Sequence, residues 1–196
     1  MQITSDIKLS ALEAIILDWY AESYNRSTQA IVRGLIKRFF VKNKKLDLKS
    51  LERFAKDFTP TLFPDDEDAQ AELLSELKAF KSAVKKGTPL PKKPSRVVDA
   101  PTSALSKARY AIHIEPIDLL LIEFRRAQKR AASRNDIIRD ILHKSFLLDR
   151  SLSTSKLRSY AKKRTAELDE QEQDSLSSEL STFVKKKKAA EAMVGG

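Results

Sequence analysis

Two short segments of the chain carry polar or small side chains at alternate positions. These side chains are Thr4, Asp6, Lys8, Arg109, Ala111 and His113. Most of them can donate or accept hydrogen bonds, but they include no nucleophile beside a base and no group with metal-ligand spacing. We therefore predict a surface that binds a partner, with no catalytic site, no metal site, no cofactor and no small-molecule substrate.

The composition points to a polyanionic partner. The 196 residues include 37 Lys and Arg against 27 Asp and Glu, which gives a formal net charge of +10. The sequence contains no cysteine, two histidines and four glycines, so thiol chemistry and a glycine-rich phosphate loop are excluded. No apolar run is long enough to cross a membrane, and residues 1–4 lack the basic start of a signal peptide. We expect a cytoplasmic binding protein with a polyanionic partner, which is not an enzyme and does not contact membranes.

The alternating segments predict two strands, at residues 3–9 and 109–114, because apolar residues there alternate with polar ones. A helix is expected directly after each strand. Ser10 is a suitable N-cap for the first of these helices, and Pro116 suits the first position of the second. A polar break and a further helix follow in both places.

The sequence repeats itself over most of its length. Residues 27–56 align without a gap to residues 133–162, with eight identical positions among thirty. Both stretches open on a serine that suits a helix N-cap, Ser27 and Ser133. The offset is 106 residues here, 105 upstream and 103 downstream, as insertions in loops would produce. We interpret the chain as a tandem duplication.

Four segments carry a resemblance to a known family. They are Ile7-Lys8-Leu9-Ser10, Asn25-Arg26-Ser27 with Ala30-Ile31-Val32-Arg33, Ile112-His113-Ile114-Glu115-Pro116 and Ser133-Arg134-Asn135-Asp136-Ile137-Ile138-Arg139. In this order they resemble the ribbon-helix-helix superfamily of Arc/MetJ/CopG-type DNA-binding proteins, over residues 2–41 and 108–147. Asn25 and Ala131 stand where the family has glycine, and asparagine tolerates a left-handed turn better than alanine does.

The resemblance implies a mainly α fold with a short two-stranded antiparallel β-ribbon. Members of this family form dimers in which each chain supplies one strand, because a single strand cannot form a ribbon alone. Two copies in one chain imply an intramolecular pseudo-dimer with appended helical pairs, similar to TraY-type proteins of plasmid conjugation.

The resemblance also implies which residues bind double-stranded DNA, since the ribbon of this family enters the major groove. The residues implied in base contact are Thr4, Asp6, Lys8, Arg109, Ala111 and His113. The residues implied in phosphate contact are Ser27, Thr28, Ser133 and Arg134, at the N-termini of the second helices. Arg33 and Arg139 occupy matched positions and suit either an ion pair with a carboxylate of the first helix or a DNA contact.

Further helices are expected after each ribbon-helix-helix half. The predicted segments are a first half at 1–45, a helical appendage at 46–87, a Pro- and Lys-rich linker at 88–107, a second half at 108–149 and a second appendage at 150–196. Apolar seams in the helices at 70–86 and 174–188 suit packing within the chain or self-association with another copy. The lysine run 185–188 is expected in solvent or against phosphates.

Three functions remain open on the sequence. The first is a sequence-specific DNA-binding protein that acts as a transcriptional repressor, or as an accessory factor of a plasmid or other mobile element in conjugation. The second is architectural, weakly specific bridging of DNA. The third is an antitoxin-like module for protein interaction, which is disfavoured because a toxin-binding tail is disordered alone whereas these appendages are predicted to fold.

Overall fold

The structure, a computed structural model, describes residues 3–42, 46–87, 110–129 and 133–194. The elements are β1 Ile3–Ile7, α1 Ala11–Tyr24, α2 Thr28–Lys42, α3 Leu48–Leu62, α4 Glu67–Lys86, β2 Tyr110–Ile114, α5 Pro116–Lys129, α6 Arg134–Leu148, α7 Thr154–Arg164, a 3₁₀ turn at Thr165–Glu167 and α8 Glu170–Val194. This confirms a mainly helical chain with one short two-stranded antiparallel sheet among the described residues. The predicted linker at 88–107 lies outside them.

The two strands pair with each other although about a hundred residues separate them. Their antiparallel register places Thr4 opposite His113 and Ile7 opposite Tyr110. One face of the sheet is buried against the helices, because Ile7, Tyr110, Ile112 and Ile114 are each at most 5 % exposed. The period of two in the sequence therefore produces a sheet with one apolar and one solvent-facing side.

Local sequence signals place the starts of the helices as predicted. Ser10 accepts a hydrogen bond from the Glu13 amide while the Glu13 carboxylate accepts one from the Ser10 amide, which is a complete capping box. Pro116 is the first residue of α5. Asn25 ends α1 in the left-handed conformation, with φ 49°, as the turn requires. Ala131 lies outside the described residues.

Some predicted boundaries were wrong by a few residues. β1 ends at Ile7 and not at residue 9, because the Lys8 amide donates to Asn135 Oδ1 (3.1 Å) instead of to a strand. Pro60 lies inside the last turn of α3. It is exposed there, and the amide that follows the helix, that of Phe63, still bonds to Thr59 O (3.0 Å).

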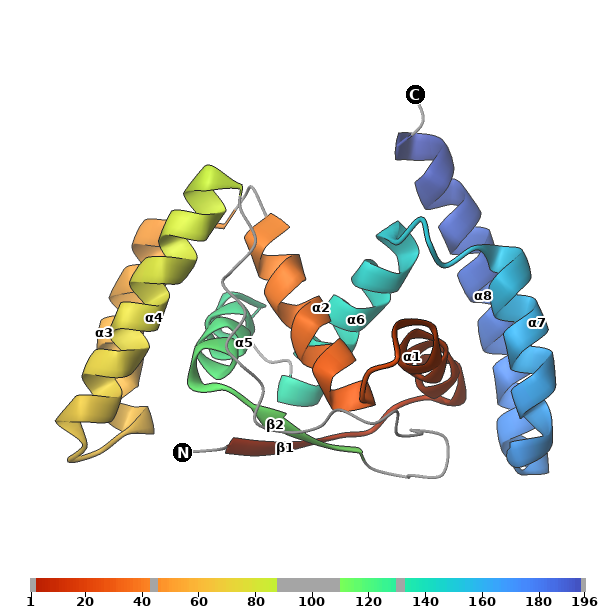
Figure 1. Cartoon of the computed structure of the whole chain (residues 1–196), viewed down its shortest axis with the longest axis horizontal. Helices are drawn as coiled ribbons and strands as arrows, with labels where there is room; N and C mark the ends of the chain where they lie inside the picture. The colour runs from red at the N-terminus through yellow and green to blue at the C-terminus, as the bar shows by residue number, and fades with distance from the viewer. Residues whose placement is uncertain (1–2, 43–45, 88–109, 130–132, 195–196) are drawn as a thin grey trace.

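The same order of one strand and four helices occurs twice. Ala11 and Pro116, Thr28 and Arg134, and Glu67 and Glu170 open corresponding helices, at the offsets of 105, 106 and 103 residues that align the sequence. In Figure 1, α1, α2, α5 and α6 lie over one face of the β1–β2 ribbon, and a helical hairpin stands on each side.

Each hairpin packs on the first helix of the opposite half. The α3–α4 hairpin contacts α5, and the α7–α8 hairpin contacts α1 (Figure 1). In the second hairpin, the Tyr160 hydroxyl donates to Glu22 (2.7 Å) and Arg164 pairs with Asp18 (3.0 Å). The hairpins also contact the second helix of their own half, through α4 with α2 and α8 with α6. Both hairpins therefore connect the two halves of the chain. The predicted segments, in which each appendage belongs only to the half before it, do not include this connection.

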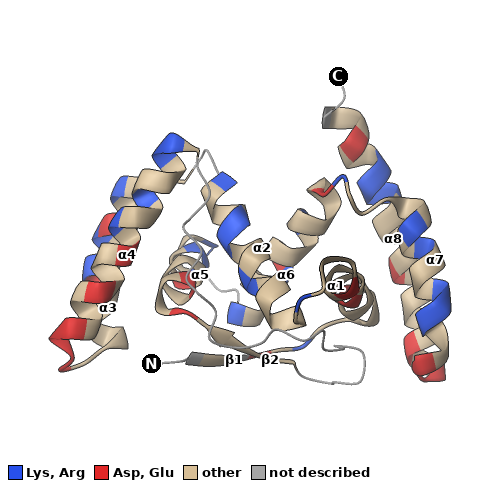
Figure 2. Cartoon of the chain, in the orientation of Figure 1, with Lys and Arg blue, Asp and Glu red and all other residues tan. Residues whose placement is uncertain are grey.

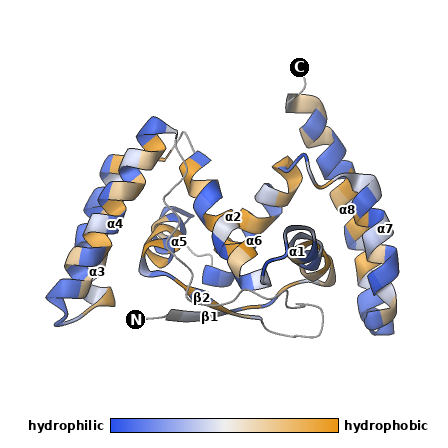
Figure 3. Cartoon of the chain, viewed as in Figure 1, coloured by the Kyte–Doolittle hydropathy of each residue, from blue (hydrophilic) through white to orange (hydrophobic). Residues whose placement is uncertain are grey.

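A single apolar core connects the described parts of the chain. The helices over the ribbon, α1, α2, α5 and α6, supply most of the buried apolar residues of this core, and Figure 3 shows hydrophobic residues along α2, α5 and α6. The seam of the hairpins joins this core, with Leu73, Leu77, Phe80, Leu176 and Phe183 each at most 3 % exposed. The seam residues thus pack within the chain, and a second copy would need another face of these helices.

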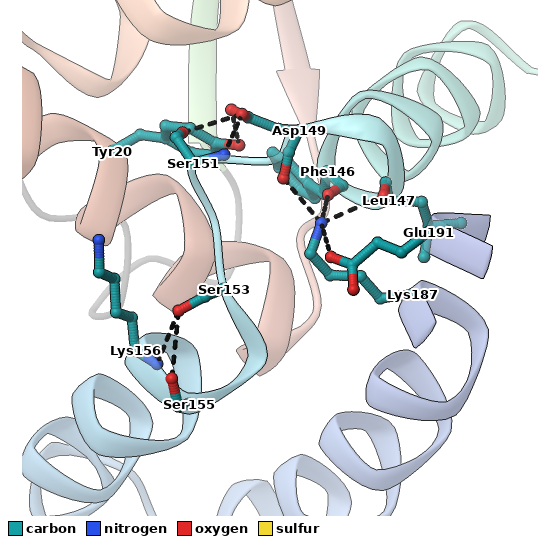
Figure 4. Close-up of polar contacts among 10 residues, drawn as sticks. All are labelled: Tyr20, Phe146, Leu147, Asp149, Ser151, Ser153, Ser155, Lys156, Lys187 and Glu191. Carbon is teal, nitrogen blue, oxygen red and sulfur yellow. Dashed lines mark hydrogen bonds and ion pairs between the residues drawn. The ribbon is translucent and has the colours of Figure 1, made fainter. Parts of the chain in front are cut away.

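A buried lysine closes the end of α6. Lys187 of α8 is fully buried, and its Nζ donates to the carbonyl oxygens of Phe146 (3.0 Å), Leu147 (3.1 Å) and Asp149 (2.8 Å), as Figure 4 shows. The Asp149 carboxylate accepts a hydrogen bond from the Tyr20 hydroxyl (2.6 Å). The prediction that the run 185–188 faces solvent or phosphates is therefore wrong for Lys187, although the other three lysines of the run are exposed.

Three basic side chains converge on Asp140 between α5 and α6. Arg125 (2.9 Å), Lys129 (2.8 Å) and Lys144 (3.1 Å) approach its carboxylate. Partial burial opposes ionisation of Asp140, but the hydrogen bonds from these cations outweigh it and hold the pKa of Asp140 well below its usual range.

This cluster makes stability sensitive to acid. An aspartate whose pKa is lower in the folded than in the unfolded state stabilises the fold above its unfolded pKa of about 3.9, and this stabilisation is lost as the pH falls toward the folded pKa. We expect the free energy of unfolding, measured in urea, to fall between pH 5 and pH 2.5, and to fall less in Asp140→Asn. The matched control Asp57→Asn, at an exposed position of α3, should keep the full decline. An unchanged decline in Asp140→Asn would contradict the assignment.

Candidate nucleic-acid interface

The outer face of the ribbon gathers the predicted base-contacting residues that the structure describes. Thr4 and Asp6 of β1 and Ala111 and His113 of β2 are all exposed on this face. The register pairs Asp6 with Ala111 and Thr4 with His113, and Thr4 Oγ1 lies 3.1 Å from His113 Nδ1. The face therefore presents side-chain hydrogen-bonding groups above a buried apolar layer.

Lys8 extends this surface beyond the end of β1. Its side chain is exposed, while its amide is held by Asn135 at the start of α6. The backbone of Lys8 is thus fixed by the opposite half, and its amine remains available to a partner. Arg109, the other basic residue predicted to contact bases, lies outside the described residues.

The N-terminus of α2 lies on the ribbon side of the molecule (Figure 1). Ser27 acts as the predicted cap, because its hydroxyl accepts a hydrogen bond from the Ala30 amide (3.2 Å). The first turn carries no acidic residue, so the positive end of the helix dipole is not neutralised there. Thr28 is fully buried and therefore cannot reach a phosphate in this structure, which corrects the expectation for that residue.

The N-terminus of α6 differs because it already holds a carboxylate. Ser133 caps the helix in a capping box with Asp136, whose carboxylate accepts from the Ser133 amide (3.0 Å) and hydroxyl (2.7 Å). These hydrogen bonds lower the pKa of Asp136, so a negative charge occupies the site that a phosphate would use. Ser133 is therefore a weaker candidate for phosphate contact than Ser27.

Arg134 is held next to this site by a buried carboxylate. Its guanidinium forms an ion pair with Glu123, which also pairs with Arg126 (2.6 Å). Burial opposes ionisation of Glu123, but the hydrogen bonds from Arg134 and Arg126 prevail and lower its pKa. Two cations share one carboxylate here, so Arg134, whose side chain is 45 % exposed, keeps positive charge at the surface.

The matched arginines of the second helices form ion pairs between the halves. Arg139 of α6 donates through Nε to both carboxylate oxygens of Glu13 in α1 (3.0 and 2.9 Å). Arg33 of α2 pairs with Glu115, which directly precedes α5 and is also paired with Lys37. Arg139 thus makes the expected ion pair with a carboxylate of a first helix, whereas Arg33 pairs with the residue just before one.

Charge is distributed unevenly around the ribbon. The ends of both hairpins on the ribbon side are acidic, as Figure 2 shows in red. The exposed carboxylates at these ends are Asp65, Asp66, Glu67, Asp68, Glu167, Asp169, Glu170 and Glu172. They would repel phosphates, so the hairpin ends are poor DNA contacts and the ribbon with its neighbouring helix N-termini is the better surface.

Other kinds of site receive no support in the described part of the chain. No group of three or more His, Asp or Glu side chains there could hold a metal ion. None of the described helices combines the length and apolar composition that crossing a bilayer requires. Comparison with family models, with curated proteins and with solved structures gave no significant match.

Proposed function

We propose that the chain is a sequence-specific double-stranded DNA-binding protein that contacts the major groove with the outer face of the β1–β2 ribbon. The observation that carries the proposal is the pairing of two distant strands with Thr4, Asp6, Ala111 and His113 exposed on one face. A two-stranded ribbon has the width that the major groove of B-DNA admits. This face carries both hydrogen-bond donors and acceptors. Base edges also present both kinds of group, whereas phosphates present only acceptors, so the face suits base edges better.

The fold itself is proposed to be a tandem ribbon-helix-helix pseudo-dimer. The repeated order of elements, the shared sequence offsets and the reciprocal hairpin contacts support this proposal. The two halves present different outward residues, Thr4 and Asp6 against His113 and Ala111, so the preferred DNA site should be asymmetric. We expect the protein to act on DNA in the nucleoid as a repressor or as an accessory factor of a plasmid or mobile element.

The salt dependence of binding separates this proposal from architectural bridging. The ribbon and the α2 and α6 N-termini offer only a few phosphate contacts, so the slope of log K against log salt should lie between about −2 and −5 on duplex DNA. Bridging through the many surface lysines would neutralise more phosphates and give a slope of about −8 or steeper. Fluorescence anisotropy with a labelled 30-base-pair duplex at several salt concentrations measures the slope, and a steep value without sequence preference would favour bridging.

A further inference from the structure

A groove lies between α2 and α6 on the side of the molecule away from the ribbon. The two helices begin near the ribbon and diverge toward their C-termini, as Figure 1 shows. Their C-terminal halves, together with Arg125 of α5, line a hollow of about 380 Å³. The lining residues used below are Leu35, Arg38, Phe39, Lys42, Lys144 and Leu148. None of them belongs to the candidate DNA surface.

Three apolar side chains, Leu35, Phe39 and Leu148, are part of the lining of this groove. Leu148, the last residue of α6, is 64 % exposed, which is unusual for a large aliphatic residue in a chain with a well-buried core. Leu35 and Phe39 also line the groove; Leu35 is buried and Phe39 half-buried, and the Arg125 guanidinium lies 4.9 Å from the Phe39 ring centroid. A concave site with exposed apolar atoms gains free energy when an apolar group of a partner covers it.

The rim of the groove is basic. Arg38 and Lys42 are exposed on α2, and the charge of Arg38 lies close enough to the Asp149 carboxylate to help lower the pKa of that group. Lys144 and Arg125 share the single carboxylate of Asp140 with Lys129, which leaves excess positive charge. Asp149 is the one acidic residue of the lining, and the hydrogen bonds from Tyr20 and Ser151 keep it ionised, so its single negative charge faces four basic lining residues, Arg38, Lys42, Arg125 and Lys144. A negatively charged partner is therefore favoured.

We propose that this groove is the docking site for an acidic segment of a partner protein, in which carboxylates meet Arg38, Lys42 and Lys144 and a large apolar side chain covers Leu148 and Phe39. Duplex DNA fits less well, because its outer surface carries phosphates and would leave the apolar side chains of Leu148 and Phe39 exposed to water. The groove lies opposite the ribbon, so a partner can dock while the ribbon holds DNA.

Panning a phage-displayed library of random 12-residue peptides on the full chain tests this proposal. Enriched peptides are then synthesised with fluorescein, and their affinity is measured by anisotropy for the wild type, Arg38→Glu and Leu148→Glu. We expect enriched peptides to combine net negative charge with Leu, Phe or Trp, and either substitution to weaken binding at least tenfold. The matched controls Arg158→Glu and Leu74→Glu, at exposed positions of α7 and α4, should change the affinity less than twofold.

Several results would overturn the proposal. They are a failure to enrich any peptide, enrichment of peptides without acidic residues, and binding that survives both groove substitutions. Self-association of the wild type that both groove substitutions abolish would identify a second copy as the occupant instead. Loss of duplex DNA binding in both groove variants, with thermal unfolding unchanged, would identify the groove as a nucleic-acid surface.

Discussion

Replacing Lys187 by methionine is expected to lower the free energy of unfolding by about 3 kcal/mol. The side chain of Lys187 is fully buried, and its amine donates to three carbonyl oxygens at the end of α6. Methionine has similar length but no donor, so these carbonyls lose their partner at a site that is buried for Phe146 O and partly buried for the other two. An unsatisfied buried polar group costs about 1–3 kcal/mol, and the loss of a cation at a helix C-terminus adds to this cost.

The neighbouring residue provides a matched control. Lys188 belongs to the same run but is exposed, so Lys188→Met should change stability by less than about 0.5 kcal/mol. Urea unfolding followed by circular dichroism at 222 nm measures both variants. Equal stability of the two variants would show that the Lys187 amine does not hold α6 in solution.

Replacing Lys8 by alanine is expected to weaken specific DNA binding by about 10- to 100-fold. A side chain that contacts a base edge contributes about 1–3 kcal/mol to discrimination against the wrong base. The Lys8 backbone is fixed by Asn135, so the substitution removes the amine without releasing the chain. Thermal stability should therefore stay close to that of the wild type.

The control for this prediction removes the same charge elsewhere. Lys56 is exposed on α3, away from the ribbon, and Lys56→Ala should reduce DNA affinity less than threefold. Anisotropy titrations on the preferred duplex and on an unrelated duplex compare the variants. If Lys8→Ala weakens both duplexes equally, Lys8 contacts phosphates and not bases.

The sequence predicts local features of this fold well, because short-range chemistry determines them. Ser10, Ser133 and Asn25 satisfy helix ends within a few residues of the chain, so their roles follow from residue type and position. The outward and inward faces of β1 and β2 follow from alternation in the same way.

The buried Lys187 shows where a signal was present but overlooked. Lys187 follows Leu176, Leu180 and Phe183 at the helical spacing of the α8 seam, so it faces the core. Its place in a run of four lysines suggested solvent instead. The pattern could have predicted burial, but only the structure supplies the carbonyl oxygens that receive its amine.

Other features depend on contacts between distant segments and could not be predicted from the sequence. Thr28 is suited by type to a helix N-terminus, but in the folded chain it is fully buried. The hairpins contact the opposite half as well as their own, and no local signal in the sequence predicts the contact with the opposite half. The groove with Arg38 and Leu148 exists only because α2 and α6 diverge after they pack together.

Selection of bound duplexes from a random DNA library, with the full chain at near-physiological salt, tests the central claim most directly. We predict enrichment of a short asymmetric motif by the wild type and loss of that enrichment in Lys8→Ala. Retention of DNA without any enriched motif, or enrichment that Lys8→Ala leaves unchanged, would contradict base contact by the β1–β2 ribbon.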